Sequence, residues 1–411
     1  MQHSLIYMPK LLQLNVTSNW GSTGRIAEEC NQIARSKGWD TYVAYGRDFN
    51  PSQSEMYCIE SRWEVYEHYL EHRLLDNEGL ASRHATKSFV RKIQELHPDI
   101  VHLHNIHDHW LNFEILFKFL NQTDIKVVYT FHDFWAMTGG CTHFVSSNCL
   151  YWQTGCHDCP QKRNLIDRSK RNYELKRKYI GGCNNLVITA VSEWVGSHVK
   201  LSFFKEKEIH VIPNGVDTQI FQPLDPSGLL KTMNLSDHFK NKFVILGVSS
   251  QWKSASKGLD DYIAMSRMLQ PDEIIVLVGV PDKIIAKLPK NMIGIQRTNS
   301  QGDLAALYSR ADVVTSFSSA ETFGLTIVEG YACGTPAVVY DNTAPPSLIT
   351  TETGLVARDH DYKDAYIKIQ KIKQKGKSYY ADACIQLARE KYDKKKCFSQ
   401  YFQLYNQIIN G

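Results

Sequence analysis

The chain has 411 residues, of which 43% are hydrophobic, and this length predicts two domains that each bury a core. Its net charge of +4 does not indicate a nucleic-acid partner, because basic residues would have to cluster to bind one. No run of about 18 apolar residues occurs, and Met1–Tyr7 lacks the regions of a signal peptide, so we expect a cytoplasmic protein. There the 10 cysteines are expected to be thiols or metal ligands rather than disulfides.

The first elements are a strand, a glycine-rich turn and a helix, which is typical of nucleotide-binding domains. Leu11–Val16 is the expected strand, and Gly21-Ser-Thr-Gly24 is the turn that precedes the helix. The third glycine and the later acidic residue of the dinucleotide fingerprint are lacking, which argues against an oxidoreductase. A tight turn without a ligand remains an alternative for the segment that contains Gly24.

Two further strands end in polar residues. They are Asp99–His104 and the run that starts at Lys126 and ends at His132 and Asp133. Because parallel strands present their carboxyl ends at the same edge of a sheet, both ends are expected at one crevice. His102 and His104 share a strand face, but the ligand pattern of a catalytic zinc is not evident.

A cysteine-rich insert follows at residues 141–160. Cys156 and Cys159 have the spacing of a zinc knuckle, and Cys141 with Cys149 would complete a tetrahedral site of four thiolates. Such a site leaves no open position, so its zinc would be structural. Reduced thiols packed under aromatic rings and disulfides are the two alternatives.

The stretch 162–178 is the most basic part of the chain, with apolar residues between its lysines and arginines. This composition suits contact with an anionic bilayer, and a solvated charged helix is the alternative. After two more strands, Pro213-Asn-Gly-Val-Asp217 has the composition of a hinge. We therefore expect domains at 1–213 and 214–391 and a final helix at 392–411.

The second domain alternates strands and helices again, which predicts another parallel sheet with both faces covered. Its first strand, Phe243–Ser250, is followed by a basic loop with Lys253 and with Lys257 before a glycine. Gln296-Arg297-Thr298 follows a later strand.

The strongest motif begins after the predicted strand Ala311–Phe317 and holds Glu321 and Glu329. Thr322-Phe-Gly324 is expected to open a helix that continues through Leu325 and stops near Gly334 and Pro336. Glu321 then lies in a loop at the carboxyl end of a strand, and Glu329 lies two turns into the helix. Backbone N–H groups at the helix start form an anion-binding site.

Two glutamates eight residues apart, with Phe-Gly inside and Gly-Thr-Pro after, resemble the donor site of glycosyltransferase family 4, whose members have the two-domain GT-B fold. The resemblance implies that Glu321 contacts the transferred sugar, that backbone N–H groups of Thr322, Phe323, Gly324 and Leu325 bind sugar and phosphate, and that Glu329 holds the ribose. It also implies that Lys257 binds the donor diphosphate.

Other residues take roles from the same resemblance. The turn with Gly24 faces the cleft, His132 lies beside the transferred sugar, and Arg297 follows the strand that borders the nucleotide base. The family's diphosphate-binding arginine is missing, and Lys253 is the residue that would replace it as a point charge. The catalytic residues implied are therefore Glu321, His132 and Lys257.

The fold implied is α/β, with two facing Rossmann-like domains, parallel sheets and a last helix that returns to the first domain. The reaction implied is retaining transfer from a UDP- or GDP-sugar, with no catalytic cofactor and no protein nucleophile. His132-Asp-Phe-Trp135 and Thr154-Gly-Cys-His-Asp-Cys-Pro160 also resemble bacterial enzymes that make colanic acid and O-antigen. That likeness implies a lipid-linked oligosaccharide acceptor.

Two other functions remain open. A sugar-nucleotide epimerase of the same fold would convert its donor without any acceptor. A non-catalytic binding protein stabilised by a structural zinc would need the four cysteines but would not need Glu321.

Overall fold

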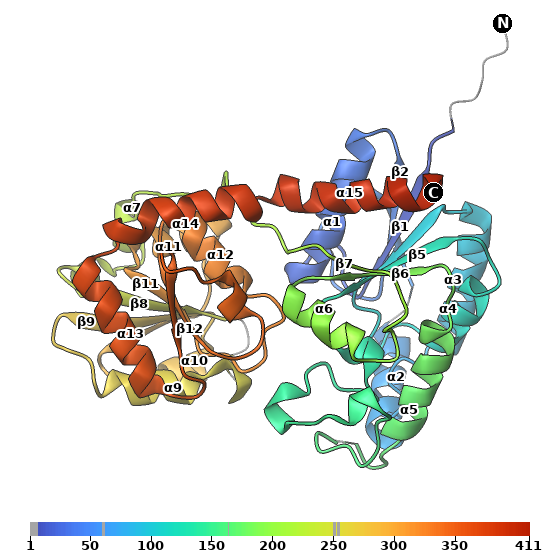
Figure 1. Ribbon diagram of the computed structural model, residues 1–411, viewed down its shortest axis with the longest axis horizontal. Coiled ribbons are helices and arrows are strands. Elements are labelled where there is room, and N and C mark those ends of the chain that lie inside the picture. The colour runs from blue at the N-terminus through green and yellow to red at the C-terminus, as the bar shows by residue number, and fades with distance from the viewer. Residues whose placement is uncertain (1–6, 60–61, 163, 250–251, 253–254) are drawn as a thin grey trace, which may run out of the picture. The chain divides into compact units, whose positions relative to one another are not determined.

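The computed structural model describes residues 7–59, 62–162, 164–249, 252 and 255–411. The chain divides into two compact units, drawn in Figure 1. Unit 1 consists of Met1–Ile212 and Phe398–Gly411, and unit 2 consists of Pro213–Cys397. The expected hinge at Pro213 falls at the first of these boundaries.

Within the described residues, unit 1 holds a seven-stranded parallel sheet of order β3-β2-β1-β4-β5-β6-β7. The strands are β1 (Lys10–Asn15), β2 (Asp40–Tyr45), β3 (Glu55–Cys58), β4 (Ile100–Leu103), β5 (Lys126–Phe131), β6 (Leu186–Ala190) and β7 (Ile209–Val211). The helices are α1 (Gly21–Ser36), α2 (Arg62–Leu75), α3 (Arg83–Leu96), α4 (Phe113–Leu120), α5 (Ser169–Lys176), α6 (Glu193–Lys200) and α15 (Lys394–Asn410), which starts in unit 2.

Unit 2 holds, in its described part, a six-stranded parallel sheet of order β10-β9-β8-β11-β12-β13. The strands are β8 (Phe243–Val248), β9 (Glu273–Val278), β10 (Met292–Ile295), β11 (Val313–Ser316), β12 (Ala337–Tyr340) and β13 (Gly354–Ala357). The helices are α7 (Ser227–Thr232), α8 (Ser236–Phe239), α9 (Leu259–Ser266), α10 (Asp282–Ile285), α11 (Gln301–Arg310), α12 (Leu325–Ala332), α13 (Tyr362–Lys375) and α14 (Ser378–Lys391).

Most residues of the central strands are apolar, as expected for parallel sheets whose two faces are both covered by helices. β1 and β4 are almost entirely buried, and so is β9. In both units the chain alternates strand and helix and every pairing of named strands is parallel. The predicted α/β fold with two parallel sheets is therefore confirmed.

Helix α15 completes the core of unit 1. Its side chains Phe398, Tyr401, Leu404 and Tyr405 are buried against Leu11 and other core residues of that unit. Trp39 contacts the rings of Phe402 and Tyr405, with centroid distances of 5.3 and 6.0 Å. The return of the last helix to the first domain, expected from the sequence, is thus present.

Membrane-spanning helices were sought in the described part of the chain. No helix there has both the length and the apolar character needed to cross a bilayer.

Candidate active site

In unit 2, the loops that follow β8 and β11 bring Lys257 and Glu321 together. β8 and β11 are adjacent in the sheet, so their carboxyl ends lie side by side. Lys257 Nζ lies 2.6 Å from Glu321 Oε1, and the two side chains are only 17% and 28% exposed. Partial burial strengthens this ion pair relative to one in open solvent. Two residues 64 positions apart therefore form a preorganised charged pair at the sheet edge.

Backbone contacts hold these two loops in place. The carbonyl oxygen of Ser256 accepts hydrogen bonds from Ser318 Oγ at 3.0 Å and from the Ser319 N–H at 2.8 Å. Gly258 has a left-handed φ of 71°, and a Cβ there would lie 2.4 Å from the Phe317 carbonyl oxygen. Only glycine allows both the conformation and the close approach, so Gly258 fixes the position of Lys257.

Helix α12 begins at Leu325, three residues later than predicted. Gly324 precedes it with a left-handed φ of 105°, which ends any helical run through Thr322 and Phe323. Phe323 is buried, and its ring lies 5.8 Å from that of Tyr392. The first N–H groups of a helix have no partner inside it and carry partial positive charge. The N–H groups expected to bind an anion therefore begin at Leu325, and Thr322–Gly324 form the loop that leads into the helix.

Glu329 lies in the second turn of α12 and is half-buried. The hydroxyl of buried Tyr308, on α11, donates a 2.8 Å hydrogen bond to Glu329 Oε2. Burial and the Glu329 carboxylate raise the pKa of Tyr308 well above its usual value. This phenol therefore stays protonated and holds the carboxylate in one orientation.

Three further donor residues were expected from the sequence: Arg297, Lys253 and Gly24. Arg297 is exposed in the loop after β10, the edge strand of the sheet, two strands from β8. Lys253 lies outside the described residues. Gly24 is buried in the first turn of α1, not in a turn before that helix, and a Cβ there would lie 2.8 Å from Thr17 Oγ1. Gly24 thus allows the close packing of α1 on the preceding loop.

In unit 1, His132 follows β5 and ends a buried chain of hydrogen-bonding groups. His132 Nε2 lies 2.9 Å from His104 Nδ1, and His104 Nε2 lies 2.7 Å from Gln13 Oε1. Gln13 Nε2 donates to the Tyr405 hydroxyl at 3.4 Å, and that hydroxyl lies 2.6 Å from His102 Nδ1. Helix α15 is thereby connected to the histidine at the sheet edge.

The three histidines of this hydrogen-bonded series, His132, His104 and His102, are neutral. Burial lowers the pKa of His132 to about 4, and it lowers the pKa values of His102 and His104 well below the ordinary range. A neutral imidazole donates through one nitrogen and accepts through the other, so it suits a relay of alternating donors and acceptors. His102 and His104 were considered as metal ligands from the sequence. In the structure they form hydrogen bonds within this buried series instead.

His107 and Asp133 form a second pair at the same edge, with His107 Nε2 2.8 Å from Asp133 Oδ2. Burial alone would lower the pKa of His107, but the charge and hydrogen bond of Asp133 raise it to about 9. Burial alone would raise the pKa of Asp133, but the charge of His107 and the hydrogen bond from the Trp135 N–H lower this pKa to about 2. Both groups are therefore charged at neutral pH, next to a neutral His132.

We expect His107→Gln to destabilise the protein in a pH-dependent way. Because the folded pKa of His107 lies above the unfolded value of about 6.5, its contribution is complete below pH 6.5 and is lost as the pH rises through about 9. The free energy of unfolding of the wild type should exceed that of the variant by about 3 kcal/mol below pH 6.5 and by much less above pH 9, since each unit of pKa shift corresponds to about 1.4 kcal/mol. Urea unfolding at several pH values measures this difference, and a difference that grows with pH would contradict the assignment.

All 10 cysteines are free thiols in the structure. Burial raises the pKa of Cys141 to about 12 and that of Cys156 to about 11, so both are protonated at neutral pH. In the described part of the chain, no group of three or more His, Cys, Asp or Glu side chains is arranged to hold a metal ion. Zinc binding by Cys141, Cys149, Cys156 and Cys159 stays a prediction.

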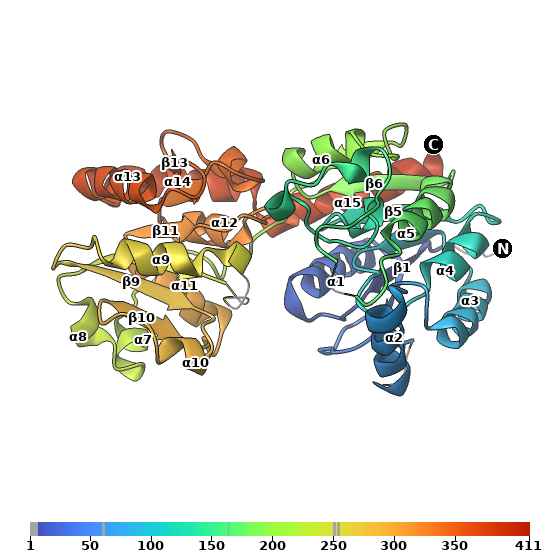
Figure 2. The ribbon, with the colours of Figure 1, turned by 90° about the horizontal axis from the view of Figure 1, so that it is seen from below.

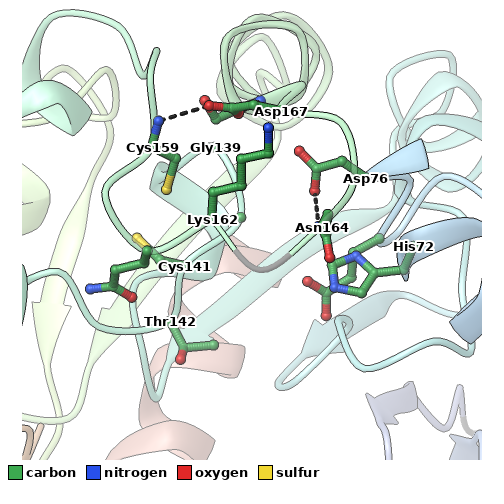
Figure 3. A pocket seen from close by; sticks show the side chains of 13 residues that line it. His72, Asp76, Gly139, Cys141, Thr142, Cys159, Lys162, Asn164 and Asp167 are labelled. Carbon is green, nitrogen blue, oxygen red and sulfur yellow. Dashed lines mark hydrogen bonds between the residues drawn. The ribbon is translucent and has the colours of Figure 1, made fainter. Parts of the chain in front are cut away.

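The insert does build a polar cavity of about 310 Å³ in unit 1, which the sequence did not indicate. Figure 3 shows side chains from α2 and from the insert around it, including His72, Cys141 and Cys159. Among the described residues, three of its lining side chains hold buried polar atoms without a protein partner: His72 Nδ1, Asn164 Oδ1 and Ser169 Oγ. Atoms of this kind suit a hydroxyl-rich ligand. The segments involved are far apart in the chain, so no local pattern marks the cavity.

Two family models match the chain and together span most of it. Glycosyltransferase Family 4 matches residues 22–220, and Glycosyl transferases group 1 matches residues 233–391. The chain thus belongs to glycosyltransferase family 4.

The curated relatives support this family over part of the chain. The colanic acid biosynthesis glycosyl transferase WcaC of Escherichia coli (strain K12) is 26% identical over 227 residues, which is 50% of this chain and 54% of the relative. A sucrose-phosphate synthase of Thermosipho melanesiensis is 27% identical over 212 residues, 48% of this chain and 47% of that protein. The chain spans about half the length of these relatives.

Solved structures match the fold over nearly the whole length. Sucrose-phosphate synthase from Thermosynechococcus elongatus has a TM-score of 0.72 at 16% identity, covering 98% of this chain and 99% of that one. Anabaena HepE in complex with UDP has a TM-score of 0.67 at 17% identity, covering 97% and 100%. At these identities the likeness establishes the GT-B fold and leaves the substrates open.

Proposed function

We propose that the protein transfers a sugar, with retention at the anomeric carbon, from a UDP- or GDP-sugar to a lipid-linked oligosaccharide during synthesis of a bacterial surface polysaccharide. We place it in the cytoplasm, at the inner face of the inner membrane. The observation that carries the donor assignment is the grouping in unit 2 of the Lys257–Glu321 pair, the start of α12 and Glu329. The relative named for colanic acid biosynthesis supports the product class.

The unit 2 residues suit a diphosphate leaving group flanked by two sets of sugar hydroxyls. Lys257 and the first N–H groups of α12 supply positive charge for the diphosphate. Glu321 accepts hydrogen bonds from hydroxyls of the transferred sugar, and Glu329, oriented by Tyr308, accepts those of the ribose. The Anabaena structures with UDP and with UDP-glucose belong to proteins of the same fold, which supports a donor of this class.

The proposed chemistry is positioning and charge stabilisation. The bond between the anomeric carbon and the diphosphate breaks, and a bond to the acceptor oxygen forms on the same face. The acceptor proton leaves to the departing diphosphate. No protein nucleophile is assigned, because Glu321 is paired with Lys257 and its partner acid Glu329 serves another part of the donor. His132 in unit 1 is assigned to stabilise positive charge at the anomeric carbon.

Thermal unfolding against a panel of UDP- and GDP-sugars tests the donor site. A ligand that binds only the folded state, at a concentration about a hundredfold above its dissociation constant, raises the free energy of unfolding by about 2.7 kcal/mol. We expect one nucleotide class to raise the Tm of the wild type and to have little effect on Glu329→Ala. Glu352→Ala, which changes an exposed glutamate of the same unit, is the matched control and should keep the shift.

If no nucleotide sugar shifts the wild type, the donor assignment is wrong. Conversion of the identified donor to another sugar nucleotide, with no acceptor present, would show an epimerase instead. Transfer that appears only when a lipid-linked acceptor is added would support the proposal.

A further inference from the structure

Helix α2 presents an apolar face to solvent. Trp63, Tyr66, Leu70 and Leu74 are 81%, 55%, 39% and 52% exposed, and their spacing of three or four residues places them along one side of the helix. The opposite side is fixed to unit 1, because buried His68 accepts from the Gly79 N–H at 3.0 Å through Nε2. The apolar face therefore belongs to a firmly packed helix.

The loop after the insert widens this face. The N–H of Leu165 donates to the Arg73 carbonyl oxygen at 3.2 Å, which holds the loop against the end of α2. Leu165 is 75% exposed, and its neighbour Ile166 is also exposed. We call Trp63, Tyr66, Leu70, Leu74 and Leu165 the α2 patch. Single exposed apolar residues are common on proteins, but a group of them on one helix face and the loop beside it is typical of an interaction site.

A basic pocket of about 440 Å³ lies beside the end of α2. It is lined by the five cations Arg83, Lys87, Lys118, Arg168 and Arg171, with Glu114 as the single acid among its described lining residues. Arg83 Nη1 contacts Glu71 of α2 at 3.1 Å, and the Arg168 N–H donates to Asp76 just after α2 at 2.9 Å. Figures 1 and 2 both show helices α2, α3, α4 and α5 grouped together in unit 1.

The carboxylates near this pocket do not balance its positive charge. Lys118 pairs with Glu114 at 2.7 Å, and Arg83 pairs with Glu71. Arg171 Nη2 donates instead to uncharged oxygens, the Asp76 carbonyl at 3.2 Å and Asn77 Oδ1 at 2.8 Å. Burial and the neighbouring Arg168 lower the pKa of Arg171, and the carboxylates of Asp76 and Glu114 offset this effect only in part. An anion in the pocket would relieve this repulsion between like charges.

We propose that α2 lies in the surface of an anionic bilayer, with the α2 patch between the lipid headgroups and the basic pocket holding lipid phosphates. Trp and Tyr favour the membrane interface, and a helix with an apolar face lies flat there. The cations of the basic pocket lie beside the α2 patch, just as the phosphate groups of a bilayer lie beside its hydrocarbon interior. A second copy of the chain fits less well, because it would bring another positively charged pocket toward the first.

This surface overlaps the basic stretch 162–178 that the sequence suggested, because Leu165, Arg168 and Arg171 belong to both, and it adds the exposed face of α2. Within that stretch Lys176 is buried, with its Nζ 2.7 Å from the Trp135 carbonyl oxygen, whereas Lys162, Lys170, Arg177 and Lys178 are exposed. Most of the apolar contact comes from α2, whose exposed face is not marked by any motif of the sequence. The proposal deepens the membrane contact in the proposed function, but its test needs no nucleotide sugar, so each can fail independently.

Sedimentation of the full chain with vesicles tests the apolar contact. We expect binding to vesicles that contain phosphatidylglycerol, and a loss of about tenfold or more in partition coefficient for Trp63→Ser/Leu74→Ser. Ile367→Ser/Tyr379→Ser removes two similarly exposed apolar side chains from unit 2 and should bind like the wild type. Circular dichroism and thermal unfolding confirm that each variant is folded.

A second pair of variants tests the basic pocket. Lys87→Ala/Arg168→Ala should bind the anionic vesicles about 30-fold more weakly, at about 1 kcal/mol for each cation near the surface, with a smaller effect at high salt. Lys363→Ala/Lys371→Ala in unit 2 is the matched control.

Three results would overturn the proposal. The wild type fails to bind anionic vesicles, or the α2 variant binds as well as the wild type. The third is that sedimentation equilibrium shows a dimer of the wild type but a monomer of Trp63→Ser/Leu74→Ser. The α2 patch would then be an interface with a second copy of the chain.

Discussion

Replacing Lys257 with methionine is expected to lower sugar transfer by about 100- to 1,000-fold, the usual effect of removing one preorganised group that stabilises transition-state charge. The lysine places its charge 2.6 Å from Glu321 at the edge of the unit 2 sheet. Methionine keeps the length of the side chain and removes the charge, so a diphosphate would face an uncompensated Glu321 carboxylate. Release of nucleoside diphosphate from the donor found by thermal shift, at saturating acceptor, measures the effect.

Lys283→Met is the control, because Lys283 is an exposed lysine on α10 of the same unit. It should change the rate by less than about twofold, as expected for a surface residue away from the site. A rate for Lys257→Met within threefold of the wild type would exclude Lys257 from the reaction. A matching loss in Glu321→Gln, with no further loss in the double variant, would show that the two residues act as one unit.

Tyr405→Ala is expected to reduce the free energy of unfolding by about 3–5 kcal/mol, the range for removing a large buried ring. Tyr405 has no exposed surface, and its ring lies beside Trp39 and His102. A loss of this size is a large part of the stability of an ordinary domain. Urea unfolding followed by tryptophan fluorescence measures it, since Trp39 reports on the same core.

Two variants separate the ring from its hydroxyl. Tyr405→Phe keeps the ring but removes the partner of His102 Nδ1 and Gln13 Nε2, and should cost about 1–3 kcal/mol. Gln403→Ala changes an exposed residue of the same helix and should stay within about 0.5 kcal/mol of the wild type. Equal stability of Tyr405→Ala and Gln403→Ala would contradict the placement of α15 in the core.

Much of the fold follows from local patterns in the sequence. The apolar runs at Leu11–Val16 and Phe243–Ser250 are β1 and β8 to within two residues at either end. Such runs, separated by helices, allow only parallel sheets with covered faces. The donor motif was also local, because Glu321 and Glu329 lie on one loop and the helix that follows it.

Sequence reasoning placed the start of α12 too early because it treated Gly324 as part of the helix. The left-handed backbone of that glycine is set by its surroundings, where a Cβ would lie 3.1 Å from Leu348. Local propensity carries no information about such a contact. The motif therefore predicts an anion site at the start of this helix, but it does not give the helix's first residue.

Long-range contacts were beyond what the sequence alone could predict. The chain from His132 through His104 and Gln13 to Tyr405 joins residues as far as 392 positions apart. In the sequence, each of these residues could equally be an ordinary core or surface residue that takes no part in such a series of hydrogen bonds. The exposed face of α2 was missed for a related reason, since an apolar stripe on a helix usually packs inward.

The path of α15 has a consequence for how the protein is made. Residues 398–411 belong to unit 1, yet they are synthesised after all of unit 2. While unit 2 leaves the ribosome, the nascent unit 1 lacks Phe398, Tyr401, Leu404 and Tyr405, so the apolar groove that receives them is open to solvent. We infer that unit 1 is most prone to aggregation and most dependent on chaperones during this interval, and that it reaches its native state only after synthesis of the second unit.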